Sequence, residues 1–267
     1  MIDRPANSVL KAFGLPSEIE SLSGGTGRSW RAGNTVLKPC DDLATWYWMA
    51  DNLPTVKQEG FRLPLPITAR DGRLIVDGWC AQNALSGEHP SNGRWADVLA
   101  VGDRFHRGVA QFTRPAFLDK RGCDPDSNPW AFGDRVAWGE TQVSVEHEAL
   151  RQMLDLLKPL ELPPQLVHGD LTENVLFTED EPPVIIDFSP YWRPVGFAAA
   201  VVVADAVCWR NADADTLLQI VSSVEEFPQL LLRALVFRMV TTIAVSRGEP
   251  DLTGYTPGID MAVRLAS

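Results

Sequence analysis

Apolar and polar residues in the first 80 positions alternate in short runs separated by turn-forming residues. Gly33-Asn34 stands between two strand-like runs, and such a pair favours a tight hairpin. Residues 43–53 show a tryptophan-rich helical pattern that begins after Asp42. We therefore predict a small antiparallel sheet with one main helix over residues 1–80. The expected strands cover residues 19–23, 29–32, 35–38, 67–69 and 73–76.

The pattern changes to helical spacing in the rest of the chain. Apolar residues recur every three or four positions over residues 95–112 and 145–157, and helical patterns dominate after Val201. Residues 123–139 are rich in turn-forming residues and tryptophan, so we expect a loop-rich insert there.

Two strand-like stretches interrupt the helical part, at residues 166–177 and 183–188. We expect them to lie side by side. The order of elements predicts an α+β fold with a small β-rich lobe over residues 1–80 and a larger, mainly helical lobe over residues 81–267.

The chain has ordinary globular composition but a marked acidic charge. Hydrophobic residues make up 45% and charged residues 22%, and the formal net charge is −11. A negative surface repels phosphate backbones, so we expect no binding to nucleic acid. The same charge suits a cationic substrate, although it also simply keeps a protein soluble.

The distribution of cysteines and apolar residues indicates the compartment. The four cysteines are scattered, with no Cys-x-x-Cys pair, which argues against a zinc site and against a disulfide framework. The first residues lack the apolar run of a signal peptide, and the longest apolar stretch, Phe197 to Val203, is too short to span a bilayer. We expect a cytoplasmic protein that does not enter a membrane.

A group of polar residues stands between the two strand-like stretches of the second lobe. Asp170 and Asn174 lie in a tight loop flanked by apolar residues, and Asp187 follows thirteen residues after Asn174. Phosphoryl transfer needs a carboxylate to receive the proton of the acceptor hydroxyl, and oxygen ligands that hold Mg²⁺ against the phosphates. The alternative is that these residues only cap turns, which would be the better explanation for either motif alone.

The run from His168-Gly169-Asp170 to Asn174, followed by Ile186-Asp187, resembles the catalytic loop of the aminoglycoside phosphotransferase and choline kinase-like family. The resemblance implies a protein-kinase-like bilobal fold. It also implies that Asp170 is the catalytic base, that Asn174 and Asp187 are Mg²⁺ ligands, and that His168 orients the loop. The longer run to Pro194 is similar to an actinobacterial branch of the family.

The sequence departs from the kinase pattern in three places. Asn174 follows Asp170 by four residues, where kinases have five, and Ser189 replaces the glycine of Asp-Phe-Gly. The helix predicted over residues 43–53 contains no glutamate to pair with a strand lysine, which leaves Asp42 or Asp51 as substitutes.

A glycine-rich turn in the first lobe is the predicted phosphate contact. Gly24, Gly25 and Gly27 precede a strand that ends in Lys38. Glycines allow backbone amides to approach phosphate, and the lysine is in position to pair with phosphate oxygens. A plain hairpin turn is the alternative. No Gly-Lys-Ser/Thr follows, so the turn is not a Walker motif.

The remaining contacts of the site are predicted from position and residue type. We expect the adenine of ATP near Trp79 and Cys80, at the junction of the lobes. Aromatic and charged residues together hold amines or sugars by stacking and charge. The candidate acceptor contacts are Trp130, Asp134, Tyr191, Trp192 and Arg193.

Together these features predict a kinase-like enzyme that uses ATP and Mg²⁺ and phosphorylates a hydroxyl of a small molecule, such as an aminoglycoside, an amino sugar or a choline-like alcohol. The shortened loop leaves a second hypothesis open, a catalytically idle pseudokinase that binds a nucleotide or a partner protein. An unrelated enzyme with a carboxylate-bound metal is a third.

Overall fold

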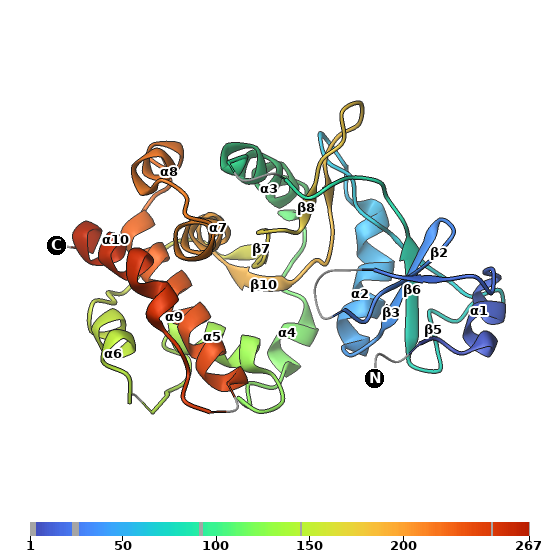
Figure 1. Ribbon diagram of the computed structural model, residues 1–267, viewed down its shortest axis with the longest axis horizontal. Helices are drawn as coiled ribbons and strands as arrows, with labels where there is room; N and C mark the ends of the chain where they lie inside the picture. Colours follow the sequence, from blue (N-terminus) through green and yellow to red (C-terminus); the bar gives the residue numbers. More distant parts are fainter. Residues whose placement is uncertain (1–3, 23–26, 91–92, 145, 247, 267) are drawn as a thin grey trace. The chain divides into compact units, whose positions relative to one another are not determined.

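The computed structural model describes residues 4–22, 27–90, 93–144, 146–246 and 248–266. The chain forms two compact units (Figure 1). Unit 1 comprises Met1–Glu88 with Leu176–Ile186, and unit 2 comprises His89–Val175 with Asp187–Ser267. The pattern of the sequence placed the division after residue 80 and gave no sign that residues 176–186 belong with the first unit.

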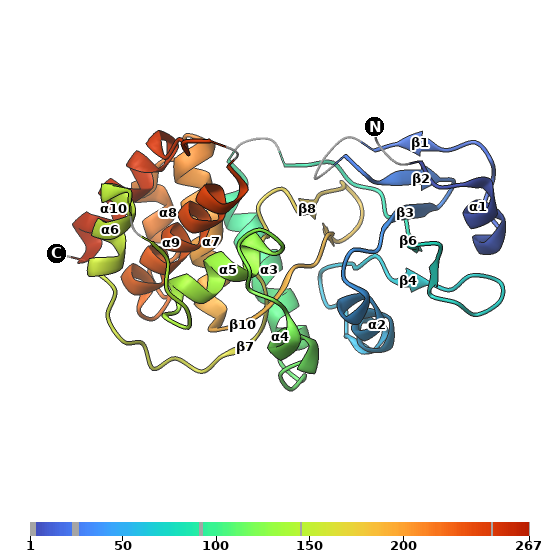
Figure 2. The ribbon, with the colours of Figure 1, turned by 90° about the horizontal axis from the view of Figure 1, so that it is seen from below.

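Unit 1 is built on one antiparallel sheet (Figure 2). Its strands follow the order β1-β2-β3-β6-β4, and β5 also pairs with β6. Gly33, with φ 59°, makes the turn between β2 and β3, which confirms the predicted hairpin. The strands are β1 (Glu20–Ser21), β2 (Trp30–Ala32), β3 (Thr35–Pro39), β4 (Pro66–Ile67), β5 (Ile75–Val76) and β6 (Trp79–Asn83).

The described residues of unit 1 also form two helices and a short 3-10 turn. Helix α2 (Leu43–Asn52) starts as predicted, because the Asp42 carboxylate accepts hydrogen bonds from the backbone N–H and the hydroxyl of Thr45. The turn η1 (Leu53–Thr55) follows it directly. Helix α1 (Asn7–Phe13) packs Val9, Leu10 and Phe13 into a core with Leu37 and Ala81 from the sheet. Each fully buried side chain of this kind stabilises the fold by about 1.5–3 kcal/mol.

Unit 2 is a bundle of helices around α9. Helices α7, α9 and α10 lie side by side, and α5 also packs against α9 (Figures 1 and 2). The helices are α3 (Trp95–Val109), α4 (Ala116–Lys120), α5 (Pro129–Ala137), α6 (Glu148–Asp155), α7 (Val195–Trp209), α8 (Ala214–Ile220), α9 (Phe227–Val245) and α10 (Thr256–Ala266), with a 3-10 turn η2 (Thr253–Tyr255).

Helix α9 is long and apolar enough to cross a membrane by length and composition alone. Its side chains are instead packed inside unit 2, where Leu230, Leu231, Leu235 and Val236 are fully buried. The helix therefore has the surroundings of a core helix.

The strands on either side of the Asp170 loop pair only in part as predicted. The stretch 166–177 divides into β7 (Gln165–His168) and β8 (Val175–Leu176), separated by the loop that carries Asp170. Strand β8 pairs with β9 (Val184–Ile185), whereas β7 pairs with β10 (Pro190–Arg193). The two stretches lie side by side as expected, but only at β8 and β9, because the polar loop after His168 interrupts the first stretch.

The insert 123–139, expected to be mostly loop, contains helix α5. Asn128 caps this helix by accepting a hydrogen bond from the backbone N–H of Ala131, and Pro129 occupies its first position. Both residue types favour a helix start, and this pair was the signal overlooked in the sequence.

Candidate active site

The loop between β7 and β8 brings Asp170 and Asn174 together despite its short length. The backbone N–H of Asn174 donates to the carbonyl oxygen of Leu171 at 3.0 Å, which closes a tight turn. Glu173 has φ 63°, a left-handed conformation that lets the chain reverse within four residues. The tight turn thus lets Asn174 reach Asp170 although the loop is one residue shorter than in the kinase pattern.

The side chain of Asn174 is oriented by Asp170. Its Nδ2 group donates to the backbone carbonyl of Asp170 at 2.6 Å and lies 3.3 Å from Oδ2 of the Asp170 carboxylate. The amide nitrogen of Asn174 faces Asp170, so the amide oxygen faces away from Asp170. That oxygen is a suitable ligand for a cation.

Two buried histidines hold the loop from behind. The backbone N–H of Asp170 donates to Nδ1 of His168 at 3.1 Å, and the backbone N–H of His168 donates to Nε2 of His106 at 3.1 Å. Burial lowers the pKa of His106 to about 3, so its imidazole is neutral and its Nε2 accepts a hydrogen bond. The orienting role predicted for His168 agrees with these contacts.

An arginine from helix α9 fixes the Asp170 carboxylate. The Nη2 group of Arg238 lies 2.6 Å from Oδ1 of Asp170 and 2.6 Å from Oδ2 of Asp205, and its Nε lies 2.9 Å from Oδ1 of Asp205. The side chains of Arg238 and Asp205 are only 12% and 5% exposed, whereas Asp170 is 42% exposed. Asp170 is therefore anchored on one side and open to solvent on the other.

The environment keeps Arg238 charged. Burial by itself lowers the pKa of the guanidinium, but the carboxylates of Asp205 and Asp170 outweigh it and hold the pKa above its ordinary value. The Asp170 carboxylate is thus engaged by the side chains of Asn174 and Arg238.

Three residues of this arrangement carry no motif and were missed in the sequence: His106, Asp205 and Arg238. Asp205 is the one charged residue of the apolar helix α7, and Arg238 shares the long apolar helix α9 only with Arg233. A single charge in such a helix is buried only when it is paired, and this was the signal that pointed to them. His106 lies on the apolar face of α3, where no pattern in the sequence distinguishes it.

Asp187 lies in a segment that runs beside the loop of Asp170. The backbone N–H of Gly169 donates to the carbonyl of Ser189 at 3.0 Å, and the ring of Phe188 packs 5.6 Å from that of His168. Asp187 has φ 47°, a left-handed conformation that is uncommon for aspartate and frequent at functional sites.

The donor set of this region fits a magnesium ion that is also bound by phosphate. In the described residues, no group of three or more His, Cys, Asp or Glu side chains could hold a metal by itself. Mg²⁺ usually takes one or two protein oxygens and completes its shell with water and substrate phosphates. The amide oxygen of Asn174 and the carboxylate of Asp187 are ligands of that type.

The predicted nucleotide contacts of unit 1 lie on β3 and β6. Lys38 stands opposite Cys80 in the sheet, and its Nζ lies 5.8 Å from the ring centre of Trp46 on α2. Where kinases have a glutamate, this helix thus presents an aromatic face to the lysine. Asp42, proposed above as a substitute partner, uses its carboxylate to cap α2.

The other predicted contacts of unit 1 are less accessible or lie outside the described residues. Trp79 and Cys80 are buried, on a strand that the sequence pattern did not reveal. Gly27 has φ 66°, a conformation that favours glycine. Gly24 and Gly25 lie outside the described residues.

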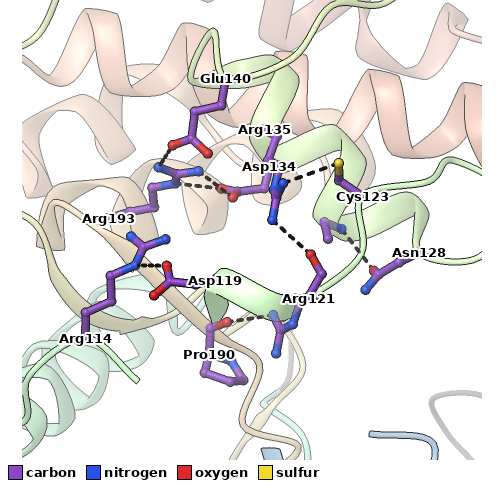
Figure 3. A network of polar contacts seen from close by, with 11 residues as sticks. Arg114, Asp119, Arg121, Cys123, Asn128, Asp134, Arg135, Glu140, Pro190 and Arg193 are labelled. Carbon is purple, nitrogen blue, oxygen red and sulfur yellow. Dashed lines mark hydrogen bonds and ion pairs between the residues drawn. The ribbon is translucent and has the colours of Figure 1, made fainter. Parts of the chain in front are cut away.

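Four of the five predicted acceptor contacts line one hollow in unit 2. Asp134, Tyr191, Trp192 and Arg193 border a small hollow that is open to solvent. Arg193 pairs with both carboxylate oxygens of Asp134, at 2.9 and 2.6 Å (Figure 3). Tyr191, Asp134 and Arg193 are largely buried, whereas the fifth residue, Trp130, is half exposed.

Comparison with known proteins supports the same interpretation of the fold. A model of the phosphotransferase enzyme family matches residues 29–191, more than half of the chain. No curated protein matches the sequence.

Solved structures of similar fold share little sequence. An amicoumacin kinase has a TM-score of 0.65 at 14% identity, with 97% of this chain and 92% of that chain covered. A spectinomycin phosphotransferase has a TM-score of 0.59 at 14% identity, with 96% of each chain covered. An aminoglycoside phosphotransferase from Alicyclobacillus acidocaldarius has a TM-score of 0.62 at 15% identity, with 100% and 93% covered.

Proposed function

Because the chain belongs to the phosphotransferase enzyme family, we propose that it transfers the γ-phosphoryl group of Mg-ATP to a hydroxyl group of a small molecule. The observation that supports this proposal is the hydrogen bond from Asn174 to the Asp170 carbonyl, which holds these two residues close together in the shortened loop. Similar structures have been solved with spectinomycin and ADP, and with hygromycin B and ADP, which supports a small-molecule acceptor.

Asp170 is the group proposed to receive the proton of the acceptor hydroxyl. Arg238 holds Oδ1, so that the carboxylate keeps one orientation while its exposed side faces the acceptor. A fixed carboxylate within hydrogen-bond reach of the hydroxyl lowers the entropic cost of the reactive geometry.

The remaining roles concern the nucleotide and the metal. Asn174 and Asp187 are proposed to hold Mg²⁺, which neutralises the charge of the phosphates when it is bound. Lys38 is proposed to bind phosphate oxygens together with the glycines of the first turn, Gly24, Gly25 and Gly27. Trp79 and Cys80 are proposed to lie near the adenine.

The test is a screen for phosphate transfer from labelled ATP to a panel of hydroxyl compounds, performed with the unmodified chain and with Asp170→Asn. The asparagine keeps the size of the side chain but removes its basicity. We expect nucleotide affinity to change little and turnover to fall by about 100-fold or more, with a residual rate from positioning.

The result also separates the enzyme from a pseudokinase. Equal turnover in Asp170→Asn and the unmodified chain would exclude Asp170 as the base. Binding of Mg-ATP without transfer to any hydroxyl compound or to water would favour the pseudokinase, for which the engagement of Asp170 by Arg238 is the structural argument.

A further inference from the structure

The hollow beside the loop of Asp170 is lined by arginines, although the chain as a whole carries a formal charge of −11. We call the space bordered by Arg114, Arg121, Arg135 and Arg193 the arginine hollow. Asp134 and Glu140 also line it, so the lining has an excess of two positive charges. With Asp119, which pairs with Arg114 at 2.7 Å, an excess of one remains.

The guanidinium groups are held in place before any ligand binds. Arg121 lies 5.5 Å from the ring centre of Phe117 and 5.9 Å from that of Tyr191, and it donates to the carbonyl of Pro190 at 3.0 Å. Arg135 donates to the carbonyl of Arg121 at 2.9 Å and to the sulfur of Cys123 at 3.4 Å. Both acceptors of Arg135 are neutral, so they orient this cation without cancelling its charge.

Arg193 and Arg114 are paired with carboxylates, and these pairs differ in burial, since the Arg193–Asp134 pair is buried and the Arg114–Asp119 pair is exposed. Both carboxylate oxygens of the buried Asp134 accept hydrogen bonds from Arg193. The Nη1 group of Arg193 lies 2.5 Å from the carboxylate of the half-exposed Glu140. The Glu140 carboxylate is 44% exposed, so it is able to turn toward water when another anion takes its place. Figure 3 shows these side chains around one space.

The arginine hollow also touches the catalytic loop. Tyr191 forms part of its wall, and a Cβ atom added to Gly169 would lie 2.4 Å from the Tyr191 ring. Asp170 directly follows Gly169. The Tyr191 ring therefore connects the hollow to the start of the loop that carries Asp170.

We propose that the arginine hollow binds a compact oxyanion, the carboxylate or phosphate group of the molecule whose hydroxyl is phosphorylated. Planar guanidinium groups bind such anions through paired, charge-assisted hydrogen bonds. That the bound molecule is then phosphorylated on a hydroxyl rests on the proposed function. The binding of an anion in the hollow does not depend on that function. It assigns an anionic acceptor, in contrast to the cationic substrate that the net charge alone suggested.

The binding test uses inorganic phosphate and malonate, with sodium chloride of equal ionic strength as the reference and no nucleotide present. We expect one or both anions to bind the unmodified chain in calorimetry, and the stronger of the two shows whether a phosphate or a carboxylate is preferred. Loss of one charge-assisted contact in Arg135→Gln should weaken binding by about tenfold. Glu140→Gln should strengthen it, because a competing carboxylate is removed.

Arg107→Gln is the matched control. Arg107 is exposed and pairs with Asp103 on the same helix, so its loss removes one positive charge outside the hollow. This variant should bind the anions like the unmodified chain. If Arg135→Gln does not fold, Arg114→Gln replaces it, because the pair of Arg114 with Asp119 is exposed.

Two outcomes overturn the inference. One is binding of phosphate and malonate no stronger than the chloride reference. The other is an affinity unaffected by Arg135→Gln and Arg114→Gln. Anion binding with the expected variant effects, but no transfer to any carboxylate- or phosphate-bearing alcohol, would uphold the site and count against the proposed function. Transfer only to cationic or neutral alcohols, without anion binding, would uphold the proposed function and contradict the anion site.

Discussion

At the scale of residues, the loop around Asp170 is held by side chains that belong to no motif. Arg238 and Asp205 form a buried ion pair that reaches Asp170, and His106 supports the backbone of His168. The motif residues were predictable because their types and spacing reflect chemistry. The residues that hold them in place, His106, Asp205 and Arg238, come together only when distant helices pack. No short stretch of sequence indicates which helices do so.

The Arg238 contact predicts a separation between stability and turnover. Arg238→Met leaves Asp205 buried without its cation, which should cost about 3–5 kcal/mol in the free energy of unfolding. The double variant Arg238→Met with Asp205→Asn removes both charges and should recover most of that loss. Turnover should stay low in the double variant, because Asp170 still lacks its anchor.

Urea unfolding and phosphate transfer measured on the same samples would check this. Arg238→Lys serves as the conservative control, since it keeps the charge but loses the paired geometry toward Asp205 and Asp170. A double variant with normal turnover would show that Arg238 acts only on stability.

The buried His106 predicts a pH dependence of stability. Its pKa in the folded chain is about 3, below the ordinary value of 6.5, so the unfolded chain binds more protons between these values. Stability is then complete above pH 6.5 and falls as the pH decreases toward 3. Between pH 7 and pH 5 the loss from this one group should be about 2 kcal/mol.

His106→Gln should remove that part of the pH dependence, as measured by urea unfolding at the two pH values. The exposed His89 provides the control, and His89→Gln should keep the full dependence. An identical pH dependence in His106→Gln and the unmodified chain would mean that His106 is not the group responsible.

At the scale of elements, most helices and strands were predictable from the sequence, but some strand pairings were not. The hairpin at Gly33 and the cap of α2 were predictable because both depend on adjacent residues. The pairing of β7 with β10 was not, since it joins segments 22 to 28 positions apart and β10 reads as a continuation of the loop. Strand β6 was missed because it is buried on both sides and shows no alternation.

The close approach of β10 to the catalytic loop gives a test of this pairing. A methyl group on Gly169 would lie 2.4 Å from the ring of Tyr191, which is itself buried. Gly169→Ala should therefore force the two strands apart and cost about 1–3 kcal/mol in the free energy of unfolding. Because Asp170 is the next residue, turnover should fall as well.

Gly122→Ala is the matched control, since nothing lies within 4 Å of an added Cβ atom at that position. Its free energy of unfolding should change by no more than about 1 kcal/mol, with a slight gain as the usual direction. Equal effects of the two substitutions on chemical unfolding would argue that the Tyr191 ring moves aside easily.

At the scale of the whole molecule, the order of a small β-rich unit and a larger helical unit was predicted, and the phosphotransferase fold is confirmed by the family match and by similar structures. Charge was less informative at this scale. The formal charge of −11 suggested a cationic substrate, whereas four arginines of unit 2 line one hollow. Net charge describes solubility and long-range attraction, and the site depends on where single charges lie.

The last prediction concerns the response of the folded chain to its nucleotide. A ligand present at 100 times its dissociation constant stabilises a protein by about 2.7 kcal/mol, so Mg-ATP should raise the melting temperature. Asp187 is the proposed metal ligand that lies beside the Asp170 loop, and Asp187→Ala should abolish the part of the shift that depends on Mg²⁺. ATP with EDTA should then stabilise Asp187→Ala and the unmodified chain equally. Asp260→Ala removes an exposed carboxylate of α10 and should leave every shift unchanged. A full magnesium-dependent shift in Asp187→Ala would assign the metal to another ligand, and no shift with Mg-ATP in the unmodified chain would contradict the phosphotransferase proposal itself.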